Sequence, residues 1–181
     1  MEDPLLKEAF PLPPMVAYRR PPNLKEKLVR AKVPPSYTRP KRTIPGMKKC
    51  RYDCLTCPYA QPSKTIKATA TNFQHDIQGS VDCQTQNVVY VITCSKCKEQ
   101  YVGQTERTLS MRFSEHRGYV NTKKLDKATG QHFNQAAHSL SDMRVSVLEK
   151  VQSKDPHMRE TRESIYINKL NTFHKGMNKR K

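Results

Sequence analysis

The pattern of apolar residues in the second half of the chain predicts three β-strands. The run Val88-Val89-Tyr90-Val91-Ile92 is β-branched and aromatic, a composition that favours strands. After Lys98-Glu99, the shorter run Gln100-Tyr101-Val102-Gly103 predicts a second strand, so the two together predict a hairpin. Residues 143–148 alternate between apolar and polar side chains and predict a third strand.

Helical spacing appears directly after this hairpin. Thr108 can cap a helix in which Leu109 and Phe113 lie four residues apart, as do Arg112 and His116. The helix therefore offers one apolar stripe and one polar stripe.

Two further helices are expected. One should lie near residues 129–138. The other should begin at Asp155-Pro156, because proline is favoured at the first helical position, and Glu163 falls in its middle. These elements predict an α+β fold with a small, mostly antiparallel three-stranded sheet flanked by helices.

The first part of the chain has a different composition. Residues 1–49 contain 10 of the 13 prolines, which limits both hydrogen-bonded ladders and buried apolar area. We expect an irregular basic arm over residues 1–49, with one short helix at residues 23–32, then a cysteine-containing segment over 50–82 and the α+β domain over 83–181.

The charge balance indicates the class of partner. The formal net charge is +17, and such an excess favours a polyanion because neutralising phosphates releases counterions. DNA is the expected partner; no apolar run of membrane-spanning length or lipidation motif supports a membrane role, and no small-molecule substrate is indicated. The segment RPKRTIPGMKK serves equally as a solvated linker or as a phosphate-contacting or nuclear-import segment, and we expect a nuclear or otherwise cytoplasmic location.

Cysteine and histidine spacing predicts a metal site. The start MEDPLLKEAF lacks the pattern of a secretory signal, so the cysteines are expected to stay reduced. Cys94-x2-Cys97 and His132-x5-His138 supply two thiolates and two imidazoles, the ligands of a closed tetrahedral Zn²⁺ site that clamps distant segments. Surface histidines beside a redox cysteine pair are the alternative.

A second cysteine group precedes the domain. Cys50-x3-Cys54-x2-Cys57 can form a second zinc site with Cys83 as the fourth ligand, and His75 competes for that position. Unliganded thiols in the arm are the alternative.

The hairpin carries a family resemblance. Val88-Val89-Tyr90, ten residues and Tyr101-Val102-Gly103 resemble the paired triads of the GIY-YIG nucleases, and Arg112, His116, Glu163 and Asn178 follow in that family's order. The Cys94/Cys97 pair between the two triads, the later histidine pair and the stretch AYRRPPNLKEKLVRAKVP resemble the Penelope-like retroelement branch, here without a reverse transcriptase. Val88 and Val89 replace the glycine and isoleucine of the first triad, which puts the backbone packing there in question.

The resemblance implies an endonuclease that hydrolyses phosphodiester bonds. Tyr90 would relay a proton from the attacking water in a network with Tyr101 and His116, provided that a nearby cation lowers its pKa. Arg112 would grip the phosphate, and Glu163 would hold Mg²⁺ or Mn²⁺.

Two further positions complete the implied site. Asn178 would orient backbone or substrate, and Gly103 would meet a backbone requirement. One site per chain implies nicking, whereas a homodimer can cut both strands.

Plainer explanations exist for each of these residues. The tyrosines can be core aromatics, Arg112 and His116 a solvated helix face, and Glu163 the partner of Arg159 or Arg162. At the level of function, the alternatives are a zinc-stabilised nucleic-acid-binding module that no longer cleaves and a small redox protein that uses the Cys94/Cys97 pair.

Overall fold

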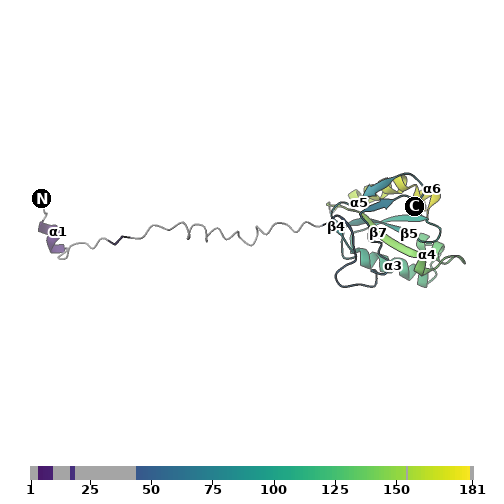
Figure 1. The fold of residues 1–181 in the computed structure, drawn as a ribbon, viewed down its shortest axis with the longest axis horizontal. Helices are drawn as coiled ribbons and strands as arrows, with labels where there is room; N and C mark the ends of the chain where they lie inside the picture. The colour runs from purple at the N-terminus through teal and green to yellow at the C-terminus, as the bar shows by residue number, and fades with distance from the viewer. Residues whose placement is uncertain (1–3, 10–16, 19–43, 154, 180–181) are drawn as a thin grey trace. The chain divides into compact units, whose positions relative to one another are not determined.

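The computed structural model describes residues 4–9, 17–18, 44–153 and 155–179 (Figure 1). The chain forms two units, Met1–Lys41 and Arg42–Lys181. Within the first, the structure describes the helix α1, Pro4–Ala9. The helix expected at residues 23–32 lies outside the described residues. Everything that follows concerns the second unit.

An antiparallel sheet of three strands organises this unit. The central strand β5, Val88–Cys94, pairs with β6, Gln100–Thr105, on one side and with β7, Met143–Lys150, on the other. The β5–β7 ladder shifts register between Val89 and Tyr90. The expected hairpin, third strand and α+β class are therefore confirmed.

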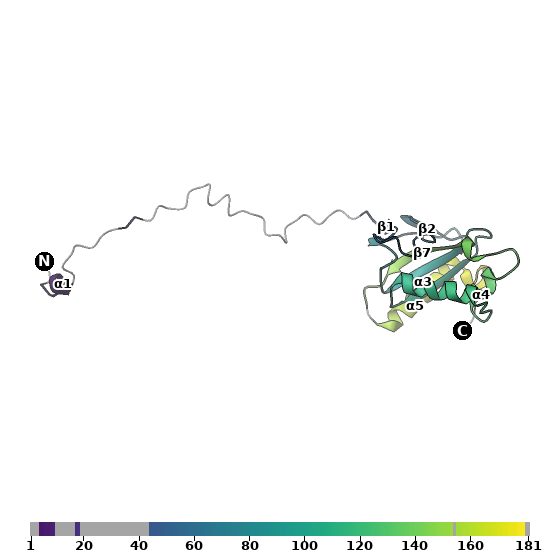
Figure 2. The same ribbon diagram turned by 90° about the horizontal axis from the view of Figure 1, so that it is seen from below.

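Helices cover both faces of the sheet (Figures 1 and 2). On one face lie α3, Leu109–Asn121, and α4, Ala128–Phe133, while α5, Pro156–Leu170, covers part of the other and leads into α6, Thr172–Lys175. The expected start signals are confirmed. The Thr108 side chain accepts the Met111 N–H at the start of α3, and Asp155 accepts the His157 N–H before Pro156 at the start of α5.

Helix α4 is shorter than the sequence led us to expect. It ends at Phe133 and not near His138, because the Asn134 side-chain amide donates to the carbonyl oxygens of Gly130 and Val120, at 2.8 and 3.0 Å. These bonds satisfy a carbonyl that a longer helix would have used. The chain is thereby free to turn back toward the hairpin.

Residues 44–82 pack on this sheet. Two small ladders form there, β1 (Gly46–Met47) with β4 (Ser80–Val81) and β2 (Thr65–Lys67) with β3 (Gln74–Asp76). Ala60 forms a parallel bridge with Val145, whose N–H and carbonyl bond to Tyr59 and Gln61, both at 2.9 Å. This segment therefore covers the outer edge of β7.

Residues at the end of the described chain close the opposite edge of the sheet, where the Met177 N–H donates to the Gln100 carbonyl at 2.9 Å. The Asn178 amide accepts the Val102 N–H and donates to the Val102 carbonyl, both at 2.8 Å. Both outer strands thus have backbone groups paired away from solvent, which prevents edge-to-edge association. No helix in the described part of the chain has the length and apolarity needed to cross a membrane.

Candidate active site

A buried tyrosine lies at the centre of the site. Tyr90, on β5, is fully buried, and its phenol oxygen lies 2.7 Å from His116 Nε2 and accepts a hydrogen bond from Arg112 Nε at 3.1 Å. Arg112 and His116 reach it together because they are four residues apart on α3. His116 is only 2% exposed, so it does not lie on a solvated helix face.

The hydrogen-bond partners fix the His116 tautomer. Arginine only donates, so the Tyr90 oxygen accepts from Arg112 and gives its own proton to His116 Nε2. The imidazole proton therefore sits on Nδ1, where it meets Thr129 Oγ1 at 2.9 Å. Burial and the neighbouring Arg112 charge lower the pKa of His116 to about 3, which keeps the ring neutral.

A cavity of about 130 Å³ opens beside these residues. Its lining comes from β6, α3, α4 and the connection between the helices: Tyr101, Arg112, His116, Tyr119, Lys127, Ala128 and Thr129. The ring of Tyr101 stands edge-on to His116, with centroids 5.3 Å apart. Tyr101 and two cations therefore face the cavity, while Tyr90 lies behind them.

Burial changes the expected role of the tyrosines. From the sequence we expected a nearby cation to lower the pKa of Tyr90. Desolvation instead raises this pKa above its usual value, and the Arg112 charge offsets the rise only in part. Burial also raises the pKa of Tyr101. Both phenols are therefore protonated at neutral pH.

Glu163 lies close enough for its charge to reach this cluster. The carboxylate contributes to the raised pKa of both Tyr90 and Tyr101, although it comes from α5 on the other side of the sheet. The two arginines that the sequence offers as its partners also contact other acids, Arg159 with Glu106 and Arg162 with Glu149.

Gly103 is required by the tyrosines. It pairs with Tyr90 across the hairpin, and a Cβ at this position would lie 2.6 Å from the Tyr90 oxygen and 2.9 Å from Tyr101 Cε1. Asn178 binds the adjacent Val102 backbone, as described above, and so holds the strand that carries Tyr101 and Gly103.

The altered first triad forms regular strand. Val88 and Val89 are both fully buried and paired with Thr105 and Gln104, and neither has a positive φ. Valine therefore fits where the resemblance led us to expect glycine.

Two groups of metal-ligating side chains flank this site. In each, the four ligand atoms lie within 4.8 Å of one another. The members are Cys50, Cys54, Cys57 and Cys83 in the first group, hereafter the four-cysteine cluster, and Cys94, Cys97, His132 and His138 in the second, hereafter the Cys₂His₂ cluster. All six cysteines are free thiols.

The spacing within both clusters fits tetrahedral zinc. A Zn–S bond of about 2.3 Å and a Zn–N bond of about 2.0 Å place two sulfurs roughly 3.8 Å apart and a sulfur and a nitrogen roughly 3.5 Å apart. Cys57 Sγ lies 3.3, 3.8 and 3.8 Å from the sulfurs of Cys50, Cys54 and Cys83.

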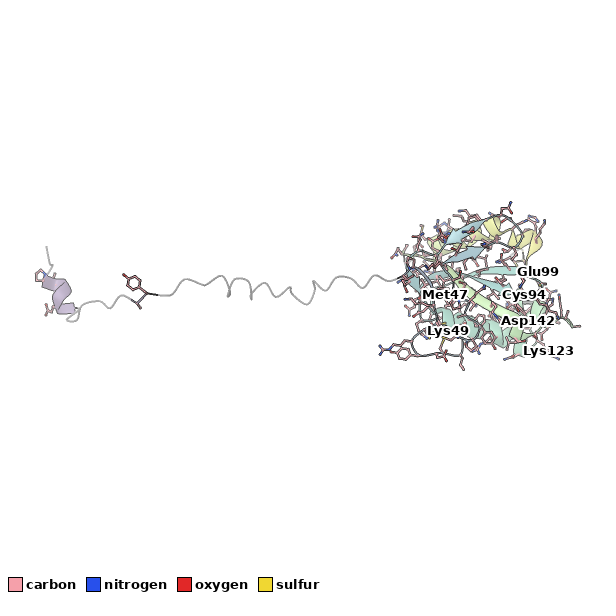
Figure 3. All side chains as sticks on the ribbon, viewed as in Figure 1. Met47, Lys49, Cys94, Glu99, Lys123 and Asp142 are labelled. Atoms are coloured by element: carbon pink, nitrogen blue, oxygen red, sulfur yellow. The ribbon has the colours of Figure 1, made fainter. Side chains whose placement is uncertain are left out.

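The Cys₂His₂ cluster fits equally well. The distance is 3.5 Å both from Cys94 Sγ to His138 Nδ1 and from Cys97 Sγ to His132 Nε2. The other His132 nitrogen faces Glu99 Oε2 at 3.5 Å, and Glu99 lies with Cys94 at the same end of the sheet (Figure 3). A carboxylate behind a ligating imidazole is a usual support for a metal site.

His75 is not the fourth ligand of the four-cysteine cluster. Its Nε2 lies 2.9 Å from the Leu148 carbonyl and 3.3 Å from the Tyr166 hydroxyl. The sulfur of Cys83, by contrast, lies with those of the other three cysteines, 3.8 Å from Cys57 Sγ.

Comparison with known proteins assigns the domain. The sequence model of the GIY-YIG catalytic domain matches residues 86–178, about half of the chain. The chain belongs to the GIY-YIG family. No curated protein and no solved structure matches it.

Membership in this family gives the general chemistry. GIY-YIG domains are nucleases that use a divalent metal to hydrolyse phosphodiester bonds, so a nucleic acid is the substrate. The matched range spans Tyr90, Tyr101, Arg112, His116 and Glu163, and ends at Asn178.

Sequence reasoning missed two residues of this GIY-YIG site, Thr129 and Lys127. Thr129 precedes His132 by three positions on α4, so the two share a helix face, and this spacing could have indicated a residue held by the metal site. Lys127 is the N-cap residue of α4 but its side chain makes no capping hydrogen bond, so no sequence pattern marked it.

Proposed function

We propose that this domain is a DNA endonuclease that nicks one strand by metal-assisted hydrolysis. The observation that carries the proposal is the hydrogen-bonded chain Arg112–Tyr90–His116–Thr129 beside a cavity that two cations line. Hydrolysis needs a positioned water, a proton path and stabilised charge on the phosphate. Each requirement has a candidate among the residues of this cluster.

The cavity would bind the phosphate that is hydrolysed. Arg112 offers a planar, permanently charged fork and Lys127 a second cation, and both stabilise negative charge that develops on the phosphate oxygens. Glu115 already bonds Arg112 and Arg107, and so orients the Arg112 fork before substrate arrives.

Protons move through the phenols and the imidazole. Tyr101 faces the cavity and would bond the attacking water, in a network that continues through Tyr90 to His116. The neutral His116 accepts the Tyr90 hydroxyl hydrogen at Nε2 and donates from Nδ1 to Thr129, so it orders this network without becoming charged.

Glu163 would hold the catalytic Mg²⁺ or Mn²⁺. A hard cation prefers oxygen ligands, and one carboxylate together with substrate phosphate is a common arrangement for Mg²⁺. When bound, such an ion polarises the phosphate and assists the leaving oxygen. The electrostatic coupling of Glu163 to both tyrosines fits this assignment.

Both cysteine-containing clusters are assigned as structural zinc sites. The four-cysteine cluster adjoins the start of α3, where Ser110 contacts Cys54, and the Cys₂His₂ cluster holds α4 to the turn of the hairpin. The two ions would thus fix the helices that carry Arg112, His116 and Thr129. Closed four-ligand sites are suited to structure and not to catalysis.

The origin and location form part of the proposal. A Cys-x-x-Cys pair between the two triads and a downstream histidine pair support descent from a Penelope-like retroelement, with the nuclease retained. The net charge of +17 and the DNA substrate support a nuclear location.

A supercoiled-plasmid assay tests this function. We expect the full chain with Mg²⁺ to convert supercoiled plasmid into the open circle, and Arg112→Ala and Glu163→Gln to leave it supercoiled while still binding it. Linear product at low protein concentration would contradict nicking by a single site. Binding without any strand break in wild type would indicate the non-cleaving module instead.

A further inference from the structure

The sheet face opposite the catalytic cluster carries a second opening. Side chains alternate along β5, so Val91 and Thr93 point away from the face that Tyr90 occupies. Above them lies a cavity of about 570 Å³ between the sheet and residues 60–69. We call it the basic groove.

The basic groove is strongly positive. Lys67, Lys98 and Arg144 line it, and no aspartate or glutamate is among the described residues of its lining. Backbone carbonyls hold two of these cations: Lys98 donates to Ser95 at 2.6 Å, and Arg144 Nη1 donates to Ser141 and Met143 at 2.7 Å. Because no carboxylate in the described lining neutralises them, their charge is available to an anion.

A buried hydroxyl lies within the groove. Ser146, on β7, is 2% exposed, and its Oγ has no hydrogen-bond partner among the described residues. Buried polar atoms are nearly always paired, so an orphaned one in a cavity wall indicates a missing ligand atom. The charged side chains of the groove, Lys67, Lys98 and Arg144, only donate, so an acceptor-rich group complements them.

We propose that the basic groove binds a phosphate of the nucleic-acid backbone. Phosphate oxygens only accept, so they suit the Ser146 hydroxyl, the Arg144 guanidinium and the two lysines together. That the phosphate comes from nucleic acid rests on the proposed function. The reacting cluster lies on the other face, so the bound phosphate is not the one that is cut, and the groove serves binding without taking part in the chemistry.

The test compares two charge-matched triple variants of the full chain. K67Q/K98Q/R144Q removes the groove cations, and K48Q/K49Q/K175Q removes three exposed cations outside it. Affinity for a fluorescent duplex of about 30 base pairs, roughly three helical turns, is measured over a range of salt concentrations. We expect the groove variant to bind about tenfold more weakly than the control variant. Its salt slope should fall by about 0.9 for each phosphate that the variant no longer neutralises. Equal reductions of affinity in the two variants would mean that only general charge matters and would overturn the proposal.

Ser146→Ala tests the orphaned hydroxyl. The variant should fold normally because it removes an unpaired group, which thermal unfolding checks. We expect weaker duplex binding, and a thermal stabilisation by inorganic phosphate that is present in wild type and reduced in the variant. Unchanged duplex binding together with unchanged phosphate stabilisation would show that the Ser146 hydroxyl binds no phosphate and would overturn the proposal. A loss of phosphate stabilisation with duplex affinity intact would assign the site to a small phosphate compound and overturn the nucleic-acid source.

Kinetics separate this inference from the proposed function. If both hold, the groove variants raise KM for plasmid nicking and leave kcat unchanged, whereas Arg112→Ala loses kcat and keeps affinity. If wild type does not cleave, the endonuclease proposal fails. The duplex affinities of the two triple variants still test whether the basic groove binds a phosphate.

Discussion

Gly103 and Tyr90 face each other in the hairpin, and the absence of a side chain on one sets the position of the other. A methyl at residue 103 would displace the Tyr90 phenol from both Arg112 and His116. We expect Gly103→Ala to lower the free energy of unfolding by about 1–3 kcal/mol, as overpacked cores do, and to abolish cleavage.

Gly118 provides the matched control for that substitution. It lies in α3, and a Cβ there would meet nothing within 4 Å. Gly118→Ala should therefore raise helix stability by roughly 0.5–1 kcal/mol and leave cleavage intact. Urea unfolding measures the stability of both variants, and plasmid nicking measures their cleavage rates. Equal effects of the two substitutions would refute the requirement for glycine at position 103.

Thr129 holds the imidazole of His116 by one hydrogen bond. Thr129→Val keeps the shape of the side chain but leaves the Nδ1–H of a buried ring unpaired, which should cost about 1–3 kcal/mol of stability. We expect slower cleavage in Thr129→Val and recovery in Thr129→Ser, measured at saturating substrate. A normal rate in a Thr129→Val protein that is destabilised would assign Thr129 to packing alone.

Individual elements were predictable where one local rule set them. Thr108 and Asp155-Pro156 mark the starts of α3 and α5, and their caps depend only on neighbouring backbone groups. The end of α4 was not predictable, since Asn134 reaches the Val120 carbonyl, a contact set by packing between two helices. The raised pKa of Tyr90 was not predictable either, because it follows from burial, which is also set by packing between elements.

Helix α4 connects the Cys₂His₂ cluster to the reacting cluster. It carries both His132 and Thr129, so a metal that binds His132 also fixes the partner of His116. Elemental analysis of the full chain should therefore find two zinc ions per chain. Cys97→Ser should reduce the count to one and slow cleavage, although Cys97 lies outside the cavity lining.

Cys54→Ser is the companion measurement, because it removes one ligand of the four-cysteine cluster. It should also leave one zinc and destabilise the start of α3 through Ser110. Full zinc occupancy in either variant, or no zinc in wild type, would contradict the structural-zinc assignment.

On the scale of the whole molecule, the sequence predicted the GIY-YIG fold but not the role of residues 44–82. Their strands are two or three residues long and pair mainly with each other, so no extended alternation marks them. Their place on the edge of β7 depends on backbone bonds to Val145, which no side-chain pattern encodes. The cysteines were visible because ligand spacing is a local signal.

The contacts of this segment predict its effect on folding. A fragment of residues 42–181 should keep the thermal stability of the full chain, since it contains the complete second unit. A fragment of residues 83–181 should be strongly destabilised, because it exposes the Val145 edge and leaves Cys83 without its three partner cysteines. Circular dichroism melting of the two fragments checks this, and an equally stable shorter fragment would make residues 50–82 a separate module.

The central claim is that Arg112, gathered with two tyrosines and His116 at one cavity, stabilises a phosphate during hydrolysis. Single-turnover cleavage of an end-labelled DNA duplex in Mg²⁺ measures this step directly. We predict that Arg112→Ala slows it by at least about 10²-fold with duplex affinity nearly unchanged, as expected when a donor to developing charge is removed. A wild-type rate in Arg112→Ala would contradict the account.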